Sequence, residues 1–112
     1  MRILVLNWRD GSHPQAGGAE VYTEEVLSRW ADAGHQVTLF SAAQADRPER
    51  ETVRGVHRVR RGHRFGVYAA ARNWYRAEGR GQFDLVIDEV NTRPFFAHRF
   101  TDAPTVALYH QT

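Results

Sequence analysis

Short apolar runs alternate with segments of helical periodicity along the whole chain. Runs of this kind, rich in Val, Ile and Leu and bounded by polar or turn-forming residues, are typical of buried strands. The pattern predicts strands at residues 2–7, 37–41, 56–60, 84–88 and 105–109. The third run alternates two valines with His57, Arg58 and Arg60, which is typical of an edge or half-exposed strand.

Two longer segments carry apolar residues at helical spacing. Residues 19–33 predict a helix that ends at Gly34, and its apolar face holds Ala19, Tyr22, Val26, Leu27 and Trp30. Residues 66–79 predict a second helix, and a short helical turn is expected around 94–100. Residues 43–54 are polar and charged and are typical of a surface loop.

This alternation predicts an α/β fold, a Rossmann-like, doubly wound parallel sheet of about five strands. Right-handed crossovers bring the carboxyl ends of such strands to one edge, where ligands bind. That edge would receive residues 8–18, 41–46, 61–66, 89–95 and 110–112. A flavodoxin-like or regulator-like domain is a weaker alternative, because it expects an acidic cluster after the first strand and Asp10 alone does not supply one.

Both faces of a parallel sheet are normally covered, yet no helix follows residues 105–109. We therefore expect a truncated domain, or one that needs a partner. An apolar sheet face left open would allow self-association as a homo-oligomer.

Composition narrows the class of protein. The chain has 112 residues, 42% hydrophobic and 25% charged, which suits one globular domain or part of one. Cysteine is absent, which excludes disulfides and zinc–thiolate sites. Neither a signal peptide nor a run of membrane-spanning length is found, so we expect a cytoplasmic protein.

The positive charge is concentrated in the middle of the chain. All 15 basic residues are arginine, and residues 54–80 hold eight of them against Glu78 alone. This block is either a solvated surface or a contact with anionic lipid, which would place the protein peripherally at the inner membrane surface. No nucleic-acid-binding motif accompanies it, so nucleic acid is not an expected partner.

Gly17 and Gly18 lie where the first helix is predicted to begin. Glycines there leave backbone N–H groups unshielded at the positive end of the helix dipole, which favours an anion such as phosphate. The long loop before them supports a ligand site, although a tight turn is the alternative.

An ordered set of motifs resembles glycosyltransferase family 4. The set comprises Asn7-Trp8-Arg9-Asp10, His13-Pro14, residues 16–22 (AGGAEVY), residues 33–39 (AGHQVTL), residues 83–89 (FDLVIDE) and residues 106–111 (VALYHQ). The resemblance covers nearly the whole chain, with residues 43–80 the least diagnostic part.

The resemblance implies the N-terminal, acceptor-side domain of a two-domain GT-B enzyme. Such an enzyme is a retaining hexosyltransferase-type glycosyltransferase that moves a sugar from a nucleotide-sugar donor to a saccharide, glycolipid or small-molecule acceptor. No metal or other cofactor is expected. The C-terminal donor-binding domain is absent from residues 1–112, so we expect this piece alone to be catalytically incomplete.

By the same resemblance, Gly17 and Gly18 would contact the donor diphosphate, and His110 would serve the reacting sugar as the catalytic residue. Arg9, Asp88, Glu89 and Asn91 would bind the acceptor. Loop capping is the alternative for Asp88, Glu89 and Asn91, and an ordinary strand-end histidine is the alternative for His110. The remaining histidines do not suggest a metal site.

A non-catalytic alternative stays open. The chain could be a carbohydrate- or nucleotide-binding half-domain that acts only with a separate partner. An in-frame coding region for a second Rossmann-like half would favour the enzyme.

Overall fold

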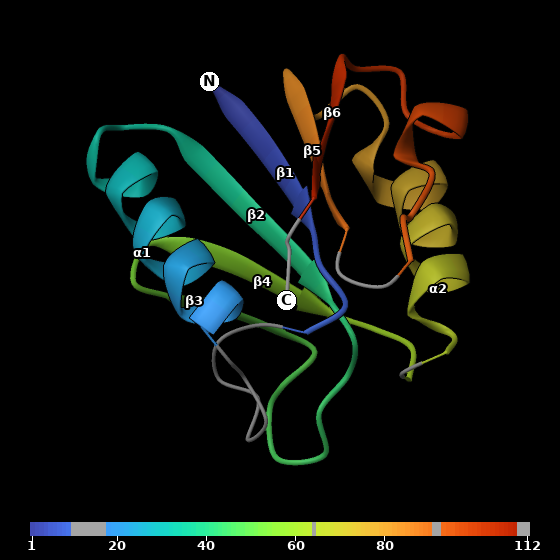
Figure 1. Ribbon diagram of the computed structural model, residues 1–112, viewed down its shortest axis with the longest axis horizontal. Coiled ribbons are helices and arrows are strands. Elements are labelled where there is room, and N and C mark those ends of the chain that lie inside the picture. The colour runs from blue at the N-terminus through green and yellow to red at the C-terminus, as the bar shows by residue number, and fades with distance from the viewer. Residues whose placement is uncertain (10–17, 64, 91–92, 110–112) are drawn as a thin grey trace.

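The computed structural model describes residues 1–9, 18–63, 65–90 and 93–109, which form a six-stranded sheet with helices on both faces (Figure 1). The strand order is β3 (Arg50–Val53), β4 (Val56–Arg60), β2 (Gln36–Ser41), β1 (Arg2–Leu6), β5 (Leu85–Val90) and β6 (Thr105–Tyr109). All neighbours are parallel except β3 and β4. The predicted α/β class and the five predicted strands are confirmed.

The sheet is doubly wound. The chain begins in the middle with β1, moves outward through β2 to β4, and then returns to the other side of β1 with β5 and β6. The order therefore reverses between β1 and β5. In open α/β sheets this switch point opens a crevice beyond the carboxyl ends of the strands.

The sixth strand corrects two predictions. Residues 43–54 are not entirely loop, because β3 pairs antiparallel with β4 in the register Arg50↔Val59 to Val53↔Val56. Consequently β4 is an interior strand and not an edge, and Arg58 and Arg60 within it are buried. Carboxylates from neighbouring elements neutralise these two arginines, which a strand pattern alone does not reveal.

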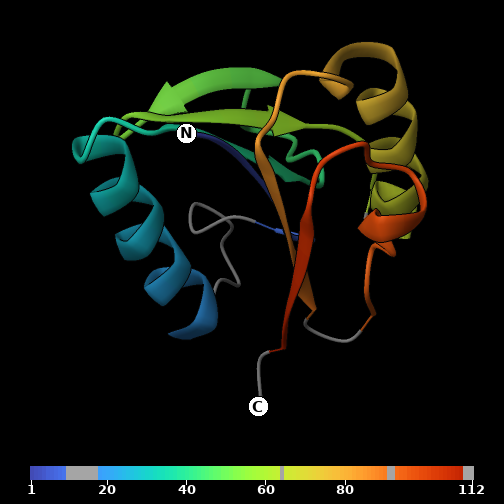
Figure 2. The same ribbon diagram turned by 90° about the horizontal axis from the view of Figure 1, so that it is seen from above.

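Two hydrophobic cores flank the sheet, and the two views together place α1 and α2 on its opposite faces (Figure 2). Ile3, Val5 and Leu39 face α1 (Gly18–Asp32), whereas Leu4, Leu6 and Phe40 face α2 (Val67–Trp74). Successive strand residues point to opposite faces, so a continuous apolar run serves both cores at once.

Both predicted helices form, with small differences. Gly34 follows α1 with φ +98°, a left-handed conformation that glycine adopts without a steric penalty. The second helix changes after Trp74 into a π-helical turn, η1 (Tyr75–Gly79). The expected turn near 94–100 is a short 3-10 helix, η2 (Ala97–Arg99). No described helix is long and apolar enough to cross a membrane.

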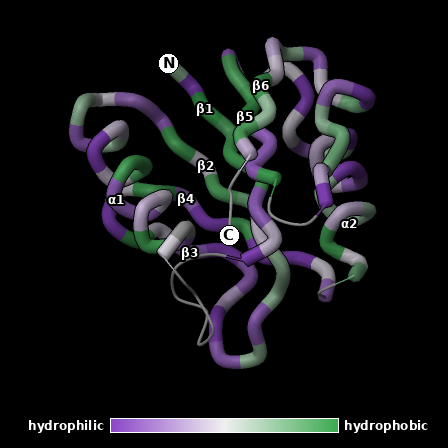
Figure 3. Tube along the Cα trace, viewed as in Figure 1, coloured by the Kyte–Doolittle hydropathy of each residue, from purple (hydrophilic) through white to green (hydrophobic). Residues whose placement is uncertain are grey.

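The α1 side of the sheet is open over β5 and β6. Figure 3 shows β6 as mainly hydrophobic, yet Val106 is 51% and Leu108 is 42% exposed. Tyr22 of α1, predicted to face the core, is 64% exposed instead. Tyr22 and Leu108 border the same small cavity of about 40 Å³ between α1 and the sheet. An apolar surface therefore continues from α1 across β6.

Candidate functional site

A buried carboxylate lies at the switch point between β1 and β5. Glu89 is only 4% exposed, and its two oxygens accept separate hydrogen bonds. Asn7 donates from Nδ2 at 2.8 Å, and Thr23 donates from Oγ1 at 2.9 Å. Three segments thus converge at one side chain, because Asn7 follows β1, Thr23 lies in α1 and Glu89 is the next-to-last residue of β5.

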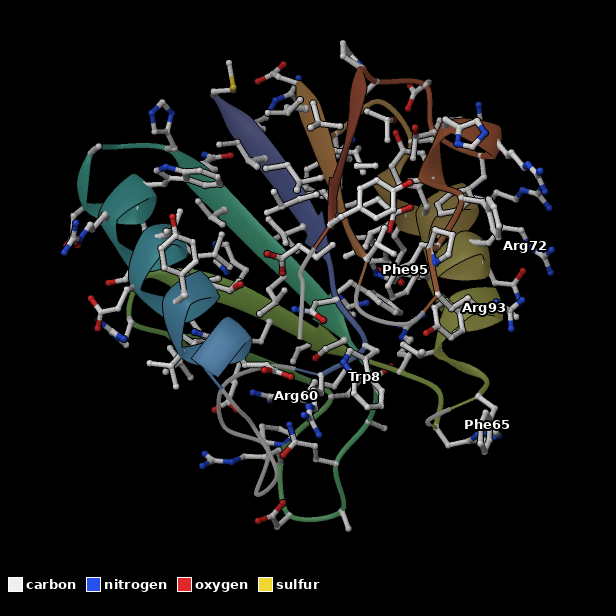
Figure 4. The ribbon with its side chains drawn as sticks, viewed as in Figure 1. Trp8, Arg60, Phe65, Arg72, Arg93 and Phe95 are labelled. Atoms are coloured by element: carbon white, nitrogen blue, oxygen red, sulfur yellow. The ribbon has the colours of Figure 1, made fainter. Side chains whose placement is uncertain are left out.

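An ion pair extends this polar cluster. Arg9 donates from Nε to Glu20 Oε1 at 2.6 Å, and Glu20 is 5% exposed in the first turn of α1. The Arg9 guanidinium also lies over the Trp8 ring, 4.5 Å from its centroid. Trp8 follows β1 and Arg60 ends β4, so both lie at the carboxyl edge of the sheet, where Figure 4 labels them. Arg9 is therefore held in place by a carboxylate and an aromatic ring.

Gly18 is the first residue of α1 and is exposed. Apart from its chain neighbours and the backbone of its own helix, no described atom lies within 4 Å of the position that a Cβ would occupy there, so the described residues leave space beside its backbone. The other glycine of the predicted pair, Gly17, lies outside the described residues. The same holds for Asn91 and His110.

Asp88 points to the opposite side of the sheet from Glu89. It is 3% exposed, and its oxygens accept the backbone N–H groups of Phe95 at 3.0 Å and Ala97 at 3.2 Å. The geometry of Asp88 is that of a loop cap. Its predicted contact with an acceptor remains a prediction.

The basic block is largely neutralised over β4. Arg58 forms a two-pronged ion pair with Glu24 at 2.6 and 2.7 Å, and Arg60 pairs with Glu51 at 2.5 Å. Arg61 contacts Glu49 and also Glu78. These pairs account for much of the charge that the sequence concentrates at residues 54–80.

Two members of the cluster were missing from the sequence prediction. Asn7 appeared only within the motif Asn7-Trp8-Arg9-Asp10, and Thr23 was not singled out, because the role of each depends on Glu89, more than 60 positions away. Their positions could have indicated this role, since Asn7 ends the first predicted strand and Thr23 lies one helical turn after Glu20. The described residues contain no group of three or more His, Asp or Glu arranged to hold a metal ion.

Fold and site together define a doubly wound α/β domain with a polar cluster at its switch point. The family model described as Glycosyltransferase Family 4 matches residues 16–112. The chain therefore belongs to glycosyltransferase family 4, as the sequence motifs predicted. No curated protein matches it. Membership indicates a glycosyltransferase-type function.

Proposed function

We propose that this chain is the acceptor-side domain of a retaining GT-B glycosyltransferase, which transfers a hexose from a nucleotide-sugar donor to an acceptor hydroxyl. The family match over residues 16–112 carries the proposal. The polar cluster at the switch point supports it, because open α/β sheets bind ligands beyond the carboxyl ends of their strands.

In this proposal the start of α1 receives the donor diphosphate. Transfer breaks the bond between the anomeric carbon and a diphosphate oxygen, so the departing group gains negative charge. An N–H group already directed at that charge lowers the barrier by about 3 kcal/mol. Gly17 and Gly18 supply such groups, and the open space beside Gly18 supports a close approach. His110 hydrogen-bonds the reacting sugar.

The acceptor pocket is assigned to Arg9, Asp88, Glu89 and Asn91. Glu89 and Asp88 are buried, so they shape the pocket through the groups that they hold. Arg9 retains partial exposure of 19% and a fixed guanidinium plane, which suits a hydrogen bond to a polar acceptor.

Most donor contacts come from a second Rossmann-like domain in the complete enzyme, and the reaction needs no metal. This chain alone is then catalytically incomplete. The proposal includes a cytoplasmic location, with the inner membrane surface as the place of peripheral contact if the acceptor is a glycolipid. Self-association of the isolated chain through its open sheet face is also part of it.

Gly18→Val in the complete enzyme tests the diphosphate contact. Because the new Cβ meets no described atom beyond its own helix and chain neighbours, we expect the variant to fold, while its branched side chain blocks the phosphate. We expect turnover with nucleotide sugars to fall by at least on the order of tenfold.

Arg29→Val is the matched control, since it places the same β-branched residue at another exposed position of α1. If the loss of turnover in Gly18→Val comes from the blocked phosphate and not from the low helix propensity of valine, Arg29→Val keeps its turnover. Wild-type turnover in Gly18→Val, with a normal melting temperature, would remove Gly18 from the site.

A further inference from the structure

A groove with a volume of about 450 Å³ runs between α2 and the segment from Arg93 to Phe100. Four arginines line it: Arg72 from α2, Arg76 from η1, and Arg93 and Arg99 from the segment after β5. Figure 4 shows Arg72 and Arg93 on the α2 side of the molecule, with Phe95 lying further inward. The groove therefore faces away from α1.

These arginines differ from those of β4, because none of the four forms an ion pair with a carboxylate of the described residues. Four positive charges thus share one groove without internal neutralisation. Arg72 and Arg76 are also one helical turn apart, an arrangement that weakens the helix through repulsion. An anion in the groove would relieve that repulsion.

Two of the guanidiniums are already oriented. Arg93 lies over the Tyr68 ring at 4.7 Å from its centroid, and Arg99 lies over the Phe96 ring at 4.5 Å. Stacking on a ring face leaves the N–H edge of a guanidinium available for a planar, two-pronged hydrogen bond. Such an edge matches the oxygens of a phosphoryl group.

The backbone of the groove wall is held in an uncommon conformation. Phe96 has φ +57° and ψ +42°, the left-handed region that a bulky residue rarely adopts. The buried Asp88 carboxylate binds the N–H groups on both sides of Phe96 and thereby fixes it. Strain maintained by surrounding contacts is characteristic of functional segments.

We propose that this groove binds the phosphoryl groups of a phosphate ester or diphosphate. Four positive charges favour a multiply charged anion, and the arginine forks favour phosphate geometry. Tyr68 and Phe96 also line the groove and hold the guanidiniums of Arg93 and Arg99 in place. This inference goes beyond sugar transfer, and no catalytic step is needed to observe it.

Calorimetric titration of the chain with inorganic pyrophosphate at low ionic strength tests the proposal. The variant Arg72→Gln/Arg76→Gln removes two exposed, unpaired arginines, so folding is preserved. We expect its affinity to fall by at least on the order of tenfold. Arg29→Gln/Arg47→Gln is the matched control, since it removes the same charge from exposed positions outside the groove and should retain affinity within about twofold.

Two further arms identify the source of the phosphate and separate this site from the proposed diphosphate contact. Gly18→Val removes the proposed contact at the start of α1, so pyrophosphate binding that survives in this variant and is lost in Arg72→Gln/Arg76→Gln is assigned to the groove. Co-sedimentation with phosphatidylglycerol vesicles, against phosphatidylcholine vesicles, reports a lipid headgroup. Binding of pyrophosphate or of phosphatidylglycerol vesicles that depends on Arg72 and Arg76 supports the groove. The assay in which it occurs shows whether the phosphate is free or belongs to a lipid headgroup. Equal losses in variant and control, or no saturable binding in both arms, overturn it.

Discussion

Asp88 and Glu89 are neighbours in the chain whose carboxylates act on opposite faces of the sheet. Glu89 binds Asn7 and Thr23 on the α1 side, whereas Asp88 binds the backbone around Phe96 on the α2 side. The sequence grouped both as acceptor residues because they follow the same strand. The strict alternation of strand side chains was sufficient to separate them, but their partners were not visible without the fold.

A second residue-level feature predicts how stability depends on pH. Tyr75 donates its hydroxyl hydrogen to Asp102, and this hydrogen bond holds the pKa of the Asp102 carboxyl below its usual value. Burial, followed by the contact with Asp102, raises the pKa of Tyr75. The Asp102 contribution to stability is therefore present above about pH 4 and is lost as the pH falls through the lowered pKa.

We expect Tyr75→Phe to make the decrease of unfolding free energy between pH 5 and pH 2 shallower than in the wild type. Asp84, whose pKa is lowered by the Arg2 backbone N–H, still contributes to this acid dependence in the variant. Urea titrations across this range measure the effect, and Asp46→Asn at an exposed loop position is the control. An unchanged pH slope in Tyr75→Phe would contradict the argument.

At the scale of elements, β4 shows where the pattern of apolar residues is insufficient. Two of its five side chains are arginines, and this favoured an edge strand. The structure instead buries Arg58 because Glu24 of α1 forms two hydrogen bonds with it. Similarly, β3 was hidden because its four residues, RETV, carry little apolar character and gain their strand conformation from pairing with β4.

The ion pair between α1 and β4 leads to a stability prediction with an internal control. Glu24→Ala leaves the guanidinium of Arg58 buried without its carboxylate partner, which we expect to cost about 3 kcal/mol of unfolding free energy. Glu25→Ala removes a pair with Arg54 in which both side chains are about half exposed, and it should cost less than about 1 kcal/mol. Chemical denaturation distinguishes the two, and equal losses would contradict the burial argument.

For the whole molecule, the class of the sheet followed from general rules of chirality and burial, whereas the order of its six strands did not. Alternating strands and helices were sufficient to predict a doubly wound sheet whose strands end at one edge. The convergence of Asn7, Thr23 and Glu89 could not be predicted, since it depends on which strands become neighbours at the switch point. The groove beside α2 escaped prediction for the same reason, because Arg72 and Arg93 approach each other only in the fold.

The open face over β5 and β6 predicts concentration-dependent association of the isolated chain. We expect sedimentation velocity to show dimers or larger species as the concentration rises, because association buries the exposed side chains of β6. Val106→Thr/Leu108→Thr should reduce association while keeping strand propensity.

Val21→Thr, which changes an exposed apolar residue on α1, is the control for surface hydrophobicity. A single monomeric species at every concentration would exclude this face as a contact surface.

Finally, three polar contacts hold α1 in position. Thr23 and Glu24 bind Glu89 and Arg58 of the sheet, and Glu20 binds Arg9 in the segment that follows β1. A rotation or translation of the helix would break several of these contacts together, so we expect its amino-terminal part to be rigid. A molecule that binds to a rigid surface loses little affinity to the ordering of the protein. Any large movement during a reaction cycle would therefore carry the helix and the sheet as one body, with the hinge elsewhere.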